Sequence, residues 1–79
     1  MKIEMILYAS LGKLSPGKSA GESFTVDLED EATVQDALKK VGVDPKSSLI
    51  IFVNGRHSKF DGVLKEGDRL AIFPPIAGG

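Results

Sequence analysis

The residues best suited to chemistry in this chain are Gly78 and Gly79, which follow Ile76 and Ala77. Glycine has no Cβ, so a diglycine end can lie extended in a narrow channel and expose its carboxyl carbon to a nucleotide and then to a nucleophile. The pattern therefore predicts that the carboxylate of Gly79 is the reactive group. A chance pair of glycines or a cloning remnant is the alternative, because a diglycine is a short motif.

A second candidate motif runs from Gly12 to Ser19, where GKLSPGKS fits the phosphate-binding pattern G-x-x-x-x-G-K-[ST]. Such a loop must open a helix whose N-terminus holds the phosphates. Residues 20–23 lead instead into an alternating pattern that is typical of a strand. We therefore expect no nucleotide site in this loop.

No other side chains form a catalytic or metal-binding pattern. The chain has no cysteine and a single histidine, so it offers no thiolate nucleophile and no zinc-ligand spacing. The acidic residues are expected to be helix caps and surface charges rather than a general acid and base; the ones weighed are Asp30, Glu31, Asp36 and Asp44. We therefore predict no catalytic residue, no metal and no cofactor bound by this chain.

Two strands and a loop are predicted in the first third of the chain. Ile3, Met5, Leu7 and Ala9 alternate with more polar residues, which predicts a strand that buries one face. Alternation over 24–28 predicts a second strand, antiparallel to the first. Between them, the segment 12–23 is rich in glycine, serine and lysine, which predicts a mobile loop without regular structure.

One amphipathic helix follows. Thr33 is the predicted N-cap, with Asp36 three residues later, and Gly42 suits the left-handed position after the last turn. The apolar residues recur at helical spacing in Val34, Ala37, Leu38 and Val41. The helix therefore has one apolar stripe, which must cover one face of a sheet.

Three more strands complete the pattern. The apolar run 49–53 predicts a central strand covered on both faces, and Asn54-Gly55 predicts a tight turn into a short strand over 56–60. A last strand is predicted from Arg69 to Phe73, stopped by prolines. We expect a domain over 1–73 and a flexible tail over 74–79.

The fold that accommodates this order is an α+β β-grasp, the ubiquitin-like fold. A hairpin, one crossover helix and a mixed sheet of four to five strands bury the only amphipathic helix against one sheet face. At 79 residues, this is one small domain with a modest core.

The sequence resembles the small sulfur-carrier family that includes the molybdopterin synthase small subunit (MoaD) and the thiamine-biosynthesis carrier (ThiS). The resemblance spans nearly the whole chain. It is carried by Ile6-Leu7-Tyr8-Ala9, by Val53-Asn54-Gly55, by Leu64-Lys65-Glu66-Gly67-Asp68 and by the end of the chain, Ala71-Ile72-Phe73-Pro74-Pro75-Ile76-Ala77-Gly78-Gly79. The Phe-Pro-Pro-x-x-Gly-Gly ending is more similar to the molybdopterin branch than to the thiamine branch.

The resemblance implies a carrier that is a substrate rather than an enzyme. A partner related to ubiquitin-activating enzymes (MoeB/ThiF-like) would use ATP to adenylate Gly79, and a sulfur donor would convert it to a thiocarboxylate. The tail would then insert into the large subunit of molybdopterin synthase (MoaE-like). Two alternatives stay open: a ubiquitin-like modifier joined to lysines through Gly79, and a carrier for thiamine or sulfur amino-acid synthesis.

The resemblance also implies a partner-binding surface made by Tyr8, His57 and Phe73, on the sheet face away from the helix. The alternatives are that Tyr8 and Phe73 complete the core and that His57 is an ordinary surface residue. In the tail, Gly78 and Ala77 would give slack for insertion, and Ile76 would lie within the inserted segment. Pro74 and Pro75 would restrict the conformations just after the sheet.

Composition argues against two classes of partner. The net charge is −1 and the pI is about 5.7, with no cluster of basic residues, so nucleic acid is not expected as a ligand. The first residues interleave charges with apolar side chains, unlike a signal peptide, and no stretch is long enough to span a membrane. We therefore expect a cytoplasmic protein.

Overall fold

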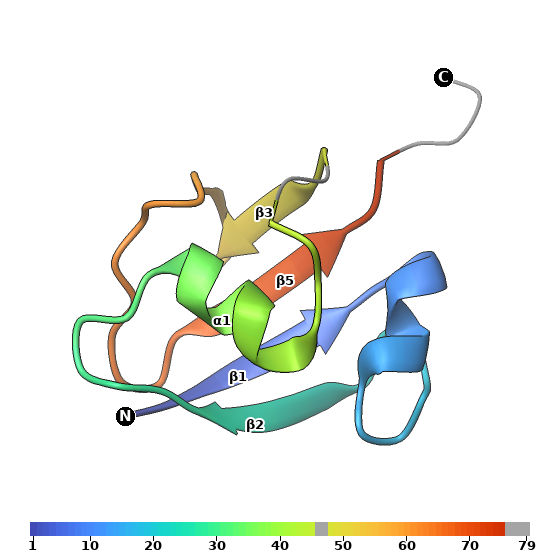
Figure 1. Cartoon of the computed structure of the whole chain (residues 1–79), viewed down its shortest axis with the longest axis horizontal. Coiled ribbons are helices and arrows are strands. Elements are labelled where there is room, and N and C mark those ends of the chain that lie inside the picture. The colour runs from blue at the N-terminus through green and yellow to red at the C-terminus, as the bar shows by residue number, and fades with distance from the viewer. Residues whose placement is uncertain (46–47, 76–79) are drawn as a thin grey trace.

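The computed structural model describes residues 1–45 and 48–75, which form a mixed sheet of five strands with one α-helix across one face (Figure 1). The sheet has the order β2-β1-β5-β3-β4. Its elements are β1 (Lys2–Leu7), the 3-10 helix η1 (Ala9–Leu14), β2 (Ser23–Asp27), α1 (Val34–Val41), β3 (Ile50–Val53), β4 (Arg56–His57) and β5 (Arg69–Phe73). The predicted β-grasp is confirmed. In these described residues, no helix is long and apolar enough to cross a membrane.

β5 holds the two halves of the sheet together. It pairs parallel with β1, where Leu7 lies beside Ile72, and antiparallel with β3, where Ile50 lies beside Phe73. β2 pairs antiparallel with β1, as predicted. The last strand of the chain is therefore the middle strand of the sheet, and the chain after it leaves from the middle of one sheet end.

The core lies between the sheet and α1. Alternate residues of each strand point to opposite faces, and the helix-facing set is buried. Its fully buried members include Met5, Leu7, Leu38, Leu70 and Ile72. The predicted helix face is confirmed for Val34, Ala37 and Leu38, while Val41 lies at the margin of the core.

Local hydrogen bonds fix both ends of α1. The Thr33 side chain accepts from the Asp36 backbone N–H and the Asp36 carboxylate accepts from the Thr33 N–H, which is the predicted capping box. These bonds to Thr33 hold the pKa of the Asp36 carboxyl below its usual value. Gly42 adopts φ 88°, the left-handed conformation predicted for it.

The first strand is shorter than predicted. β1 ends at Leu7, and Ala9 is not a buried strand residue but an exposed residue of η1 with φ 51°. The chain turns there because the Leu11 N–H donates to the Tyr8 carbonyl, while the Gly21 N–H donates to the Leu7 carbonyl. The alternation in the sequence continued past the strand end by chance.

The segment 12–23 is more regular than predicted. Its first residues belong to η1, and hydrogen bonds of the Ser15 side chain hold its middle part in place. The buried Ser15 hydroxyl donates to the Gly12 carbonyl at 2.7 Å and accepts from the Ser19 N–H at 3.1 Å. The segment then enters β2 rather than a helix. The prediction that this segment leads into a strand rather than a helix is therefore confirmed.

Two expectations for the third and fourth strands were wrong. β3 is not covered on both faces: Ile51 is buried against the helix side, but Ile50 and Phe52 on the other face are only half-buried. β4 covers two residues rather than 56–60. The chain leaves the sheet after β4 because the carbonyls of Phe60 and Gly62 turn to accept from the first N–H groups of α1.

The close approach of Gly12 to Ala20 gives a test of this segment. A Cβ on Gly12 would lie 2.5 Å from the Ala20 backbone, so Gly12→Ala should destabilise the fold by about 1–3 kcal/mol through overpacking. At Gly17 the nearest atom is the flexible Glu22 carboxylate at 3.3 Å, so Gly17→Ala should leave stability within about 0.5 kcal/mol. Urea unfolding of both variants measures this, and equal midpoints would contradict the close packing.

Candidate functional site

The sheet face opposite α1, here called the outer face, carries a row of four rings. Tyr8 and Phe73 are stacked, with ring centroids 4.2 Å apart and planes 4° from parallel. Phe73 meets Phe52 edge to face at 5.9 Å and 87°, and Phe52 meets His57 edge to face at 4.9 Å and 72°. The row crosses the sheet from the end of β1 to β4. These are the offset and edge contacts that aromatic rings favour.

Strand pairing places these rings side by side. The Tyr8 N–H donates to the Ile72 carbonyl at 3.0 Å, which continues the β1–β5 ladder and sets Tyr8 next to Phe73. Phe52 lies directly opposite His57 in the β3–β4 pair. Residues that are 65 positions apart in the sequence therefore become ring neighbours because the first and last strands are parallel partners.

The three predicted surface residues are thus brought to one face, and neither aromatic residue belongs to the buried core. Tyr8 and Phe73 are half-buried and His57 is exposed. Their role in partner binding stays a prediction.

Phe52 and Phe73 separate two shallow depressions on the outer face. One, of about 710 Å³, is almost entirely apolar and lies at the start of the tail; it is lined by Ala9, Ser10, Ile50, Phe52, His57, Phe73, Pro74 and Pro75. The other, of about 680 Å³, lies farther along the sheet and contains an ion pair among apolar residues. We call them the tail-side depression and the ion-pair depression.

The ion pair is formed by Glu4 and Arg69, which are direct neighbours in the β1–β5 pair. The Arg69 Nε donates to Glu4 Oε1 at 2.6 Å. This hydrogen bond is the main reason that the pKa of the Glu4 carboxyl lies below its usual value. The Glu4 carboxyl is therefore ionised at neutral pH.

Asn54 anchors the far rim of the ion-pair depression. Its side-chain amide donates to the Asp68 carboxylate at 2.9 Å and its side-chain oxygen accepts from the Arg69 N–H at 2.9 Å. Asn54 and Gly55 have φ values of 53° and 81°, as the predicted tight turn requires. The turn between β3 and β4 is thereby tied to the start of β5.

The predicted tail residues divide into two groups. Pro74 and Pro75 belong to the described part of the chain and line the tail-side depression. Ile76, Ala77, Gly78 and Gly79, and with them the predicted reactive carboxylate, lie outside the described residues.

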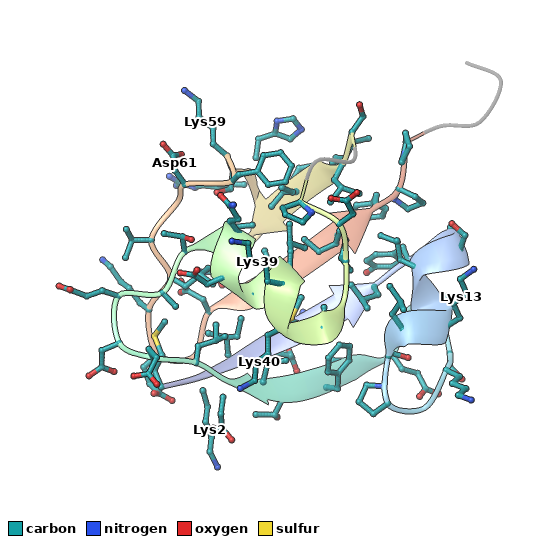
Figure 2. The ribbon with its side chains drawn as sticks, viewed as in Figure 1. Lys2, Lys13, Lys39, Lys40, Lys59 and Asp61 are labelled. Atoms are coloured by element: carbon teal, nitrogen blue, oxygen red, sulfur yellow. The ribbon has the colours of Figure 1, made fainter. Side chains whose placement is uncertain are left out.

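Positive charge is dispersed over the molecule. The lysines labelled in Figure 2 come from β1, η1, the helix and the loop after β4; they are Lys2, Lys13, Lys39, Lys40 and Lys59. Across residues 1–45 and 48–75, no group of three or more histidine, cysteine, aspartate or glutamate side chains could hold a metal ion.

Sequence reasoning missed Phe52, Ile50 and the Glu4–Arg69 pair. A signal for the first two was present: a strand that is apolar at every position has two apolar faces. Since the sequence predicts only one helix, one of those faces had to remain uncovered. No comparable signal marked Glu4 and Arg69, because their contact depends on the parallel register of β1 and β5.

Comparison with known proteins identifies the family. The model of the ThiS family matches residues 12–79, which is most of the chain. The chain belongs to the ThiS family. This group of small ubiquitin-like sulfur carriers and modifiers includes MoaD-type proteins, and the resemblance seen in the sequence is confirmed.

Relatives of this ThiS-family chain include both modifiers and carriers. Small archaeal modifier protein 1 from Haloferax volcanii is 30% identical over 91 residues, covering 98% of this chain and 100% of that protein. Its crystal structure has a TM-score of 0.73 with full coverage of both chains at 29% identity. The family is thus one of small carriers or modifiers.

Two further structures share the fold at lower identity. One is a proposed molybdopterin converting factor, subunit 1, from Pyrococcus furiosus, with a TM-score of 0.73 and 24% identity over 96% of this chain and 99% of that one. The other is subunit 1 in a complex with subunit 2 of the molybdopterin-converting factor from Helicobacter pylori, with a TM-score of 0.55 and 21% identity over both full chains.

Stability measurements can separate the two faces of β5. Ile72 is fully buried on the helix side, so Ile72→Ala should cost about 2–5 kcal/mol of unfolding free energy. Phe73 is half-buried on the outer face, so Phe73→Ala should cost less than about 3 kcal/mol, below the usual range for a core phenylalanine. Denaturant unfolding compares the two, and an equal or larger loss for Phe73→Ala would make it a core residue.

Proposed function

We propose that this chain is a sulfur carrier in molybdopterin biosynthesis, and that Gly79 is the residue that carries sulfur as a thiocarboxylate. The observation that carries the proposal is the position of the tail-side depression, which Phe73, Pro74 and Pro75 line. A partner that binds this depression also holds the start of the segment 74–79. Fully extended, six residues reach up to about 20 Å, which is enough to enter a separate active site.

The chemistry requires only the tail carboxylate from this chain. A carboxylate is a poor electrophile, so its oxygen first attacks the α-phosphate of ATP to form a mixed anhydride with AMP and release pyrophosphate. A sulfur donor then attacks the carboxyl carbon, the C–O bond to AMP breaks, and a thiocarboxylate is left. Catalysis of both steps belongs to partners, and ATP is bound by the activating partner.

Two partners follow from this proposal. The first is an adenylyltransferase of the ubiquitin-activating type (MoeB/ThiF-like), and the second is a molybdopterin synthase large subunit (MoaE-like). The second is supported by the Helicobacter pylori complex, in which a protein of the same fold is assembled with subunit 2. Because ATP is supplied inside the cell, this activation would take place in the cytoplasm.

The proposed roles of the tail residues follow from their backbones. Pro74 and Pro75 have restricted φ angles and so lower the entropy that is lost when the tail is threaded into a partner. Ile76 and Ala77 would occupy the inserted segment. Gly78 would allow close approach to the adenylate because it has no side chain.

A ubiquitin-like modifier is the second candidate function. It is favoured by the 30% identity to a small archaeal modifier protein over the full length of that protein. Both functions would use the same adenylated Gly79 and differ only in the acceptor, which is sulfide for a carrier and a lysine amine for a modifier. A carrier for thiamine or sulfur amino-acid synthesis would use the same thiocarboxylate with a different recipient.

Intact mass spectrometry tests the proposed function directly. After incubation with ATP, a sulfide source and the adenylyltransferase encoded by the same genome, the chain should gain the mass that replaces one oxygen by sulfur. The gain should be absent without ATP and absent when Gly79 is deleted. Deletion should leave the unfolding midpoint unchanged, because β5 ends at Phe73.

Other outcomes of that experiment would favour a different function or a different pathway. Adducts on protein lysines without the sulfur-for-oxygen mass gain would favour the modifier. If the thiocarboxylate forms, transfer to a pterin precursor in the presence of the large subunit identifies the molybdopterin pathway, and failure of that transfer with success in a thiazole-forming assay would reject it.

Partner binding through the outer face is tested by removing one ring. Phe73→Ala should weaken binding to the adenylyltransferase by about tenfold or more, as expected for a central aromatic anchor. Val63 is a matched control, because it is apolar and 60% exposed but lies in the bridge to Thr33 beside α1. Val63→Ala should bind like the unmodified chain in calorimetry, and equal losses for both variants would contradict docking through the outer face.

A further inference from the structure

We propose that the adenylyltransferase partner places an acidic side chain against Arg69, and that this contact, together with the apolar rings, determines how tightly the carrier is bound. The inference rests on the proposed function, because it requires a partner that covers the outer face. The activating enzyme is the partner concerned, since a carrier and a modifier both need it. The contact would lie in the ion-pair depression, beyond Phe73 from the start of the tail.

The Arg69 guanidinium is held in position by one hydrogen bond, but most of its N–H donors have no acceptor among the described residues. Its Nε is bound to Glu4 at 2.6 Å, which fixes one edge of the planar guanidinium. Within the described residues, the Arg69 guanidinium makes no further hydrogen bond, and 62% of the side chain is exposed. A guanidinium has five N–H donors in a fixed fork. The other four therefore have no hydrogen-bond partner among the described residues.

Glu4 is better satisfied than Arg69. Its carboxylate accepts from Arg69 and is also hydrogen-bonded by the side chain of Ser23 on the neighbouring strand, and both contacts lower its pKa. The unmet hydrogen-bonding capacity of the pair therefore belongs mainly to the cation. A partner needs to supply acceptors more than donors.

Covering this depression removes water from those donors. Part of its lining is apolar or aromatic, namely Ile6, Tyr8, Phe52 and Phe73, which lie in the same depression as the ion pair. A donor that is buried without an acceptor loses its hydrogen bonds to water without replacement, and this loss is larger for a charged group. A partner that makes close contact with the rings must therefore supply an acceptor at Arg69 or lose much of the binding energy gained from the rings.

A carboxylate fits this position best. Its two oxygens match the arginine fork and form two parallel hydrogen bonds, which a single backbone carbonyl cannot do. Among the described residues that line the two depressions, Arg69 is the only lysine or arginine. Within the two depressions, the partner's acidic group therefore has one cationic counterpart.

A matched pair of variants tests the contact. Arg69→Gln and Arg56→Gln change the net charge equally, but Arg56 is paired with Val53 and lies on the helix side of the sheet. Calorimetry with the adenylyltransferase should show binding weakened by about tenfold for Arg69→Gln and by less than about twofold for Arg56→Gln. Raising the salt concentration should weaken binding of the unmodified chain more than binding of Arg69→Gln.

Arg69→Lys separates the fork from the charge. Lysine keeps the cation but cannot bind a carboxylate bidentately, so its affinity should be several-fold below that of the unmodified chain. Unmodified affinity for Arg69→Lys would overturn the forked contact. Thermal unfolding of all three variants should stay close to that of the unmodified chain, because ion pairs that are exposed to solvent contribute little to stability.

The outcomes separate this inference from the proposed function. If the unmodified chain becomes a thiocarboxylate but Arg69→Gln binds no more weakly than Arg56→Gln, the acidic contact is wrong and the carrier function stands. If the unmodified chain is neither bound nor adenylated, the proposed function fails. At saturating enzyme, Arg69→Gln should still form the thiocarboxylate, because Arg69 acts in binding rather than in the reaction.

Discussion

One helix of eight residues can cover only one face of a five-stranded sheet, and the rest of this molecule follows from that limit. The helix side buries the apolar set that supplies the stability of a small domain. The outer face is left to solvent, although β3 is apolar on both of its faces. An apolar sheet face that no helix covers is typical of a protein–protein interaction surface.

The position of β5 turns that open face into a site. As the middle strand, β5 borders β1 on one side and β3 on the other, so Phe73 contacts rings from both neighbours. The chain then continues through Pro74 and Pro75 from the same end of the sheet. A partner can therefore recognise the folded surface and the beginning of the tail together.

Much of the fold could be predicted from the sequence, because local signals agreed with the final structure. Thr33, Asp36 and Gly42 mark both ends of the helix, and 69–73 is a strand with the predicted bounds. The predictions failed where contacts between distant parts of the sequence determine where a strand ends. Ala9 leaves the strand because of hydrogen bonds to the segment that follows. After Ser58, whose N–H still donates to the Ile51 carbonyl, the chain leaves the sheet and the Phe60 carbonyl accepts from the helix. Tyr8, His57 and Phe73 were placed on one face by resemblance, whereas Phe52 and the Glu4–Arg69 pair required the register of the strands.

Three features of the outer face limit the apolar area that it exposes to solvent. Stacking of Tyr8 on Phe73 lets each ring cover part of the other, and Ile6 is only 8% exposed. The Glu4–Arg69 pair places two charges within the same face, which limits the contiguous apolar area that two copies could bury against each other. A partner with an acceptor for Arg69 would satisfy the guanidinium while it covers the neighbouring rings.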